Sequence, residues 1–165
     1  MTLLTLPALQ VLAVNPNGPA PTNGLSKGKN DHLYLFEKDG EPEWNIVEDG
    51  AWAKMNINLK QNKFVFNAHG LTPEQDYELI CYMDPWPGEG SILLGTGTAD
   101  EEGNVHIKDL IDYDELHDVD DETYLGSKIW LVPAEDFDEA QQKMVAWNAD
   151  QILFEFDLLN QPPTE

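Results

Sequence analysis

From residue 32 onward, short runs of β-branched and aromatic residues alternate with turn residues, and this pattern constrains the fold more than any other feature of the chain. In the run Lys63–Asn67, Phe64 and Phe66 fall on one face, and Lys, Val and Asn fall on the other. Turn-forming pairs such as Asp39-Gly40 and Asp49-Gly50 separate the runs. This alternation is typical of antiparallel strands with one buried face. The sequence therefore predicts an all-β fold.

About ten segments have the length and composition of strands, and helical periodicity is weak and confined to Glu135–Lys143. The expected strands are His32–Lys38, Trp44–Glu48, Trp52–Leu59, Lys63–Ala68, Tyr77–Met83, Ile92–Ala99, Asn104–Lys108, Lys128–Val132, Met144–Trp147 and Ile152–Leu158. So many short strands predict a two-sheet antiparallel β-sandwich of Greek-key or jelly-roll type with an extended N-terminal segment. The residues expected to face inward are Phe64, Phe66, Tyr77, Leu79, Ile129, Leu131, Phe154 and Phe156, and Glu155 and Asp157 are expected to point outward.

Composition divides the chain into four segments. Residues 1–14 are apolar and uncharged, and residues 15–31 form a linker rich in Pro, Gly and Asn. Residues 32–160 carry the strand pattern and are expected to form one β-sandwich domain, followed by a C-terminal tail at residues 161–165.

The apolar N-terminal segment is too short to cross a membrane as a helix, which takes about 20 residues. It resembles the core of a signal peptide but lacks the usual basic start. We expect it to act as a donor strand that fills the open edge of a neighbouring copy, which makes a head-to-tail homo-oligomer. A retained signal peptide and a strand that returns to its own sheet are the alternatives. The residues expected to make this contact are Leu3, Leu4, Leu6, Leu9, Val11, Leu12 and Val14.

Charge excludes one class of partner. The chain has 31 acidic residues against nine basic ones, all of them Lys, for a net charge of −22. Nucleic-acid binding depends on Lys and Arg that neutralise phosphates, so we expect no nucleic-acid partner.

Carboxylates are concentrated between Asp109 and Glu122, and hard cations such as Ca²⁺ are bound by six to eight oxygen atoms. The helix–loop–helix calcium motif does not fit, because Leu116 stands where an oxygen ligand is needed and Thr123 takes the twelfth position. A calcium site built from converging loops is one interpretation, and a solvated acidic loop is the other. The candidate ligands are Asp112, Asp114, Asp118, Asp120 and Asp121.

Three further features have structural interpretations. Trp86 stands between two prolines, where its ring could stack on a sugar, although we favour a role in covering the edge of the sandwich. Leu71, in the segment Gly70–Pro73, is expected to close one end of the core. Cys81 lies in an apolar run and is expected to be a buried, unreactive thiol.

Signals for catalysis are weak. No serine lies in a nucleophile-elbow motif, and the four histidines have no metal-ligand spacing. We therefore expect that the protein is not an enzyme.

Several segments together resemble the secreted β-sandwich domains that are common in methanogenic archaea. They are His32–Lys38, Phe64–Pro73, Asp76–Leu79, Asp84–Gly88, Gly95–Asp100, Gly126–Val132 and Trp147-Asn148, so the resemblance covers about residues 32–159. It implies a β-sandwich fold and an extracellular or cell-surface location, and it assigns no active site. On these grounds we expect an extracellular structural protein, a subunit of a surface fibre or filament assembled by N-terminal strand donation. The alternatives are a carbohydrate-binding or adhesive surface module and, third, a secreted hydrolase.

Overall fold

The computed structural model describes residues 31–40, 43–58, 60–112, 115–116, 126–156 and 158–159. Strands dominate this part of the chain, and it contains no α-helix, so the all-β prediction is confirmed. Within it, no helix is long and apolar enough to span a membrane. The elements are β1 Asp31–Glu37, β2 Trp52–Asn58, β3 Lys63–His69, β4 Asp76–Tyr82, β5 Ile92–Thr98, β6 Val105–Leu110, β7 Lys128–Pro133, the 3₁₀ turn η1 Ala134–Asp136, β8 Phe137–Asp138, β9 Lys143–Met144, the 3₁₀ turn η2 Ala149–Gln151 and β10 Leu153–Glu155.

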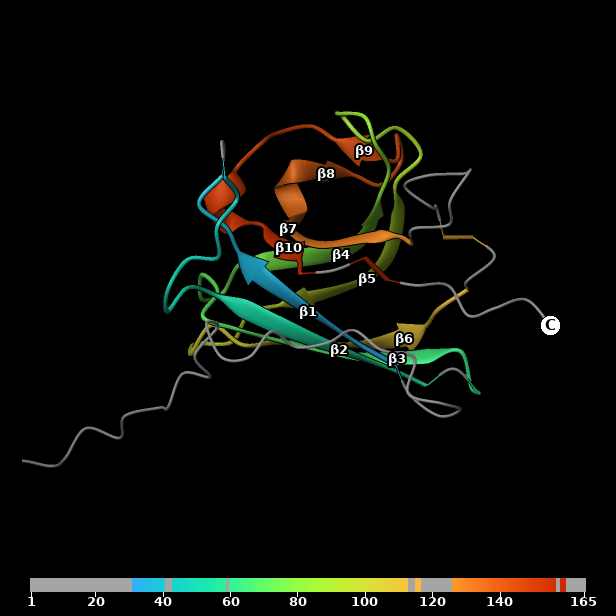
Figure 1. The fold of residues 1–165 in the computed structure, drawn as a ribbon, viewed down its shortest axis with the longest axis horizontal. Coiled ribbons are helices and arrows are strands. Elements are labelled where there is room, and N and C mark those ends of the chain that lie inside the picture. The colour runs from blue at the N-terminus through green and yellow to red at the C-terminus, as the bar shows by residue number, and fades with distance from the viewer. Residues whose placement is uncertain are drawn as a thin grey trace, which may run out of the picture.

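Eight of the strands form one antiparallel sheet in the order β5-β4-β7-β10-β1-β2-β3-β6, and β8 pairs with β9 in a small separate hairpin. The long sheet curls until its edge strands, β5 and β6, lie against each other (Figure 1). Two glycines of β5 permit this approach: a Cβ atom on Gly95 would lie 2.6 Å from Ile107, and one on Gly97 would lie 2.9 Å from Val105.

The sheet is therefore nearly barrel-like, and the two packed sheets that the sequence predicts are not clearly separate. The strands β10 and β1 join the upper and lower layers of Figure 1 through a continuous ladder of backbone pairs, such as Phe36 with Phe154. Hydrophobic alternation indicates which residues are buried between two layers. It does not indicate whether the layers belong to one sheet, because that depends on pairing between strands far apart in sequence.

One predicted strand is absent. Trp44–Glu48 is not a strand; Ile46 makes an isolated bridge to Lys38, and Trp44 has a left-handed backbone conformation with φ of 52°. The weak helical pattern of Glu135–Lys143 corresponds to part of η1, the short strand β8 and a turn. The other predicted strands are present with boundaries shifted by a few residues, and the last two are much shorter than predicted.

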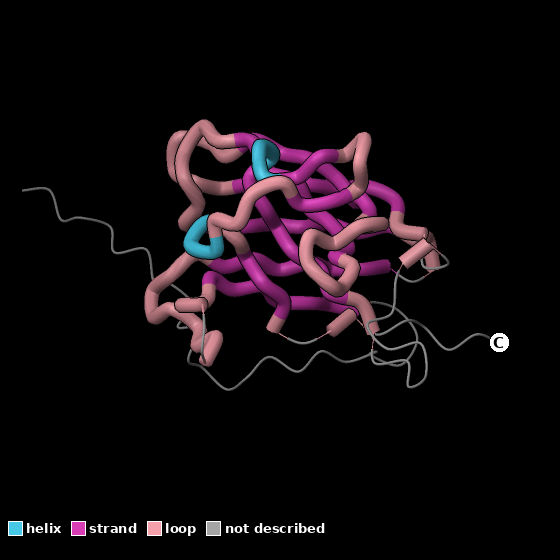
Figure 2. Tube along the Cα trace, turned by 90° about the horizontal axis from the view of Figure 1, so that it is seen from above, coloured by secondary structure: helices cyan, strands magenta, loops and turns pink. Residues whose placement is uncertain are grey.

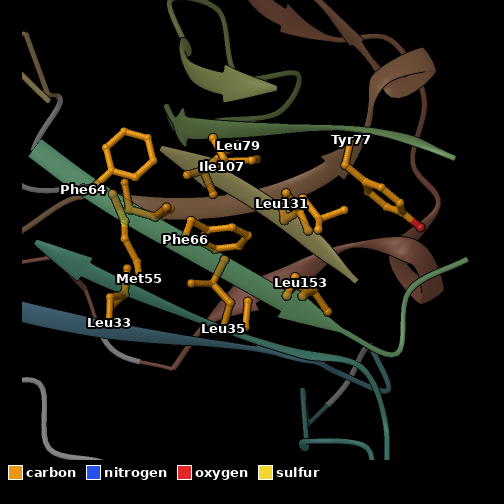
Figure 3. Close-up of a cluster of buried hydrophobic side chains, with 14 of the residues drawn as sticks. Leu33, Leu35, Met55, Phe64, Phe66, Tyr77, Leu79, Ile107, Leu131 and Leu153 are labelled. Atoms are coloured by element: carbon orange, nitrogen blue, oxygen red, sulfur yellow. The ribbon is translucent and has the colours of Figure 1, made fainter. Parts of the chain in front are cut away.

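The main core fills the inside of the curled sheet, where side chains from the two layers point toward each other (Figure 3). Among the residues predicted to face inward, six lie in this core with at most 1% exposure: Phe64, Phe66, Tyr77, Leu79, Ile129 and Leu131. Leu71 closes the core as predicted, and the Cys81 thiol is buried. The prediction for the last strand is wrong by one position: Leu153 enters the main core, whereas Phe154 packs on the opposite face of the sheet and Phe156 is half-buried against Phe36.

Candidate functional site: an aromatic pocket on the outer face

A second cluster of large side chains covers the outer face of the sheet where β4, β7 and β10 lie side by side. Alternation places Tyr82, Trp130 and Phe154 on this face, while their chain neighbours Cys81, Ile129 and Leu153 enter the main core. The rings of Tyr82 and Trp130 are stacked, with centroids 3.7 Å apart and planes 11° apart. Phe154 meets Trp130 edge to face at 5.1 Å. These three rings form the base of the site.

The loop that follows β4 carries Trp86 over this base. Ser91, fully buried, holds the loop closed: its Oγ donates to the Gly88 carbonyl at 2.7 Å and accepts from the Met83 N–H at 3.0 Å. Gly88 has φ of 80°, and a Cβ there would lie 2.4 Å from the Tyr82 ring, so only glycine permits this close approach. The Met144 N–H donates to the Pro87 carbonyl, which ties the loop to β9 (Figure 1).

Trp147 is positioned by a buried acidic residue. Asp136 is 1% exposed and accepts two bonds from the Asn148 side-chain amide, at 2.8 and 2.9 Å. Its backbone carbonyl also accepts from the Val145 N–H. Burial raises the pKa of Asp136, and the bonds from Asn148 oppose that rise. Because both ends of the segment 145–148 are held in this way, Trp147 is presented from a fixed backbone.

Trp44 completes the wall from the loop between β1 and β2. Its ring meets Phe154 at 5.2 Å and Trp147 at 6.0 Å, in both cases nearly edge to face. The left-handed backbone of Trp44 is uncommon for a bulky residue, and such strain is concentrated at functional sites. Figure 2 shows loops and the short 3₁₀ turns around and over the strands of the sheet.

Together these groups enclose a pocket of about 750 Å³, which we call the aromatic pocket. Its lining residues are Lys38, Trp44, Tyr82, Asp84, Trp86, Lys128, Trp130, Trp147, Phe154 and Glu155. The volume is in the range of small-molecule sites. Trp86 is 48% exposed and Trp147 is 44% exposed, with ring centroids 5.4 Å apart and planes nearly perpendicular. Two large aromatic rings therefore remain open to a ligand at the mouth of the pocket.

Each charged group at the rim has a partner. The Lys128 ammonium forms an ion pair with the Asp84 carboxylate, and the Lys38 ammonium donates to the Glu155 backbone carbonyl at 2.8 Å. Burial, and next the charge of Asp84, raises the pKa of the Tyr82 hydroxyl to about 12. Tyr82 is therefore a neutral phenol at physiological pH, and the rim carries both signs of charge.

Glu155 is the exceptional group of the site. Burial is the main cause that raises its pKa to about 7, against the opposing effects of its own backbone N–H and of the positive charges of Lys38 and Lys128. Within the described part of the chain, the buried Oε2 atom of Glu155 has no hydrogen-bond partner, and neither has the buried indole Nε1 of Trp130. Trp130 lies close enough to lower the pKa of Glu155 slightly, but the two groups do not meet in hydrogen-bonding geometry. The expectation that Glu155 points to solvent is therefore wrong.

The structure places the predicted site residues as follows. Trp86 lines the aromatic pocket, and its contact with a ligand stays a prediction. Of the five predicted calcium ligands, Asp112 is described, whereas Asp114, Asp118, Asp120 and Asp121 lie outside the described residues. Among the residues that the structure describes, no three His, Cys, Asp or Glu side chains gather in a group that could hold a metal ion. The apolar segment 1–14 also lies outside the described residues, so strand donation and head-to-tail assembly stay predictions.

Sequence reasoning missed most of the pocket. Of the aromatic residues at its mouth and wall, it singled out Trp86 alone and did not consider Trp44, Trp130 or Trp147 as ligand contacts. The available signal was the number of tryptophans in a chain of this size, five in 165 residues. A second signal was the acidic Glu155 within the apolar run Ile152–Phe156. Neither signal indicates that these residues converge.

No protein-family model and no curated protein matches this sequence. The resemblance to secreted archaeal domains therefore stays an expectation, as does the extracellular location. The geometry of the aromatic pocket is the main basis for a functional proposal.

Proposed function

We propose that this protein is a non-catalytic binding domain whose aromatic pocket takes a carbohydrate. One observation carries the proposal: Trp86 and Trp147 stand half-exposed at the mouth of a pocket of about 750 Å³ that also has charged groups at its rim. Aromatic faces stack on the apolar faces of sugar rings, and a few polar groups placed around them fix the orientation of the ligand.

The way in which the rings are held supports binding. Trp86 is fixed by the buried Ser91, and Trp147 by the pair of Asp136 and Asn148. A site whose side chains are already fixed before binding loses little conformational entropy when the ligand arrives. The pocket is therefore preorganised by buried polar contacts that have no evident role in the main core.

Binding is favoured over hydrolysis by the state of the two carboxylates that line the pocket. Most glycoside hydrolases need a pair of carboxyl groups that flank the bound sugar, one of them as the acid. Here the Asp84 carboxylate is already paired with Lys128, so of the two only Glu155 has a buried carboxyl oxygen without a hydrogen-bond partner among the described residues. This arrangement suits recognition of a ligand better than attack on it.

A glycan array probed with the purified protein tests the proposal. We expect binding to one class of glycan, and loss of that binding by at least tenfold in Trp86→Ala and in Trp147→Ala, since stacking on an aromatic ring is lost. Trp52→Ala is the matched control, because Trp52 packs on His69 and does not line the pocket. Absence of binding to every glycan, or equal binding by the two pocket variants, would contradict the proposal.

A further inference from the structure

The aromatic pocket has a feature that stacking does not use: its lining residues carry two buried polar atoms that have no partner among the residues the structure describes. These atoms are the Oε2 of Glu155, an acceptor when ionised, and the Nε1–H of Trp130, a donor. Buried polar groups in folded proteins are nearly always hydrogen-bonded, so each exception needs an explanation. Here one donor and one acceptor are left unpaired in neighbouring groups.

The backbone explains why the pair is open. The ladder between β7 and β10 consists of a single residue pair, Leu131 with Leu153. Beyond it, the Glu155 carbonyl accepts from the Lys38 side chain, and the Phe156 N–H donates to Tyr34 of β1. The end of β10 thus stays paired with β1 beyond its one pair with β7, and pairing on the β7 side resumes at the isolated bridge of Ser127 with Leu159. Glu155 and Trp130 both line the pocket at this point.

Charge around this pair argues against an ionic ligand. Lys38 faces Glu155 from the end of β1, Lys128 faces it from β7, and Asp84 and Tyr82 belong to β4 and its following loop. Lys128 is already paired with Asp84, and Glu155, with a pKa of about 7, is a neutral acid in about half of the molecules at pH 7. The pocket therefore offers no strong excess of either sign, and the net charge of −22 on the whole chain repels anions.

A hydroxyl group matches the unpaired atoms. It accepts one hydrogen bond and donates another, so one hydroxyl can accept from Trp130 Nε1–H and donate to Glu155 Oε2. An ammonium group cannot accept from the indole, and a carboxylate cannot donate to the ionised form of Glu155. A site built to bond a hydroxyl rejects ligands without one, because its buried groups then stay unpaired.

We infer that the aromatic pocket selects a neutral, hydroxyl-bearing sugar over acidic and amino sugars, and that Glu155 and Trp130 are the residues that determine this specificity. The inference rests on the proposed carbohydrate binding and specifies its substrate class. Stacking on Trp86 and Trp147 supplies contact area for any sugar ring, whereas the polar pair distinguishes among ring substituents.

The test uses an array that carries neutral glycans beside matched charged forms: methyl-esterified and free oligogalacturonate, and N-acetylated and deacetylated chitin oligomers. For the glycan class that binds, we expect the neutral form to bind at least tenfold more tightly at pH 7. Glu155→Leu removes the acceptor and Trp130→Phe removes the donor, and each should weaken binding of the neutral form by about tenfold. Glu155→Gln keeps an acceptor oxygen and should retain binding within a few-fold.

A matched control comes from β4. Glu78 also has a buried Oε2 without a partner, and burial, followed by the charge of Glu139, raises its pKa, but Glu78 does not line the aromatic pocket. Glu78→Leu should leave affinity and preference unchanged. Equal binding of neutral and charged forms, or undiminished binding in both Glu155→Leu and Trp130→Phe, overturns this inference and leaves the proposed function standing. Absence of binding to every glycan overturns both.

Discussion

The two faces of the curled sheet differ in what fills them. The inside is packed with aliphatic and phenyl side chains contributed by nearly every strand, such as Leu35, Phe66 and Leu131, each fully buried. The outer face of β4, β7 and β10 instead carries indole and phenol rings, two of them about half exposed, together with unpaired polar atoms. The first face contributes stability through burial of apolar area. The outer face keeps buried polar atoms without hydrogen-bond partners among the described residues. Such atoms do not add to stability, and under the proposed function they contact the ligand.

The largest expected effect is on the inner face. Phe66→Ala removes a fully buried ring and leaves a cavity, so the free energy of unfolding should fall by about 3–5 kcal/mol. Urea denaturation followed by circular dichroism measures this change. Val65→Ala, one position along β3 and 39% exposed, should cost less than about 1 kcal/mol. Similar losses in the two variants would contradict the assignment of the faces.

The next effect belongs to the outer face and depends on pH. The pKa of Glu155 is about 7 in the folded protein and 4.5 without perturbation, so from pH 4.5 to 7 the native state keeps a proton that the unfolded state has lost. Stability therefore falls as pH rises through this window. Glu155→Gln has no titrating group at this position, so its free energy of unfolding should not fall with pH for this reason. The variant should match the wild type near pH 4 and be more stable by about 3 kcal/mol at pH 8. Parallel stability curves for the two proteins from pH 4 to 8 would show that the carboxyl group is not buried as described.

A smaller effect tests the contact between the edge strands β5 and β6, where the sheet curls closed around the main core. Gly97→Val places a branched side chain where a Cβ already lies 2.9 Å from Val105 and 3.0 Å from Ile107. Overpacking of this kind should cost about 1–3 kcal/mol, measured as a lower urea midpoint. Thr96→Val, at an exposed position of the same strand, is the control and should change stability by less than about 0.5 kcal/mol. If Gly97→Val is tolerated as well as the control, β5 and β6 do not pack this closely.

The smallest expected effect on stability concerns Trp147 on the outer face, and here stability and glycan binding should change in opposite proportion to the effects of Phe66→Ala. Trp147→Ala removes a ring that is 44% exposed, so it should lower the free energy of unfolding by less than Phe66→Ala does, by about 1–2 kcal/mol. The same variant should lose glycan binding by at least tenfold, whereas a destabilised but folded Phe66→Ala protein should bind normally. A large loss of stability in Trp147→Ala would instead assign the outer cluster to the core.

The sequence by itself determined the all-β class and the position of most strands, because alternation and turn residues act over a few neighbours. It also identified the inward-facing residues of the regular strands, such as Phe64 and Phe66 in β3 and Tyr77 and Leu79 in β4. Where both faces of a strand are apolar, the pattern no longer indicates the direction. Leu153 and Phe154 are both buried, and only the structure assigns one to the core and the other to the aromatic pocket.

The tertiary structure alone decided the closure of the sheet and the assembly of the pocket. Trp44, Trp86, Trp130 and Trp147 come from separate loops and strands, and their rings meet because β4, β7 and β10 pair across long stretches of sequence. The environment of Glu155 likewise depends on β10 leaving β7 after one residue pair. Contacts of this kind depend on the three-dimensional path of the backbone, and no local pattern of residues specifies that path.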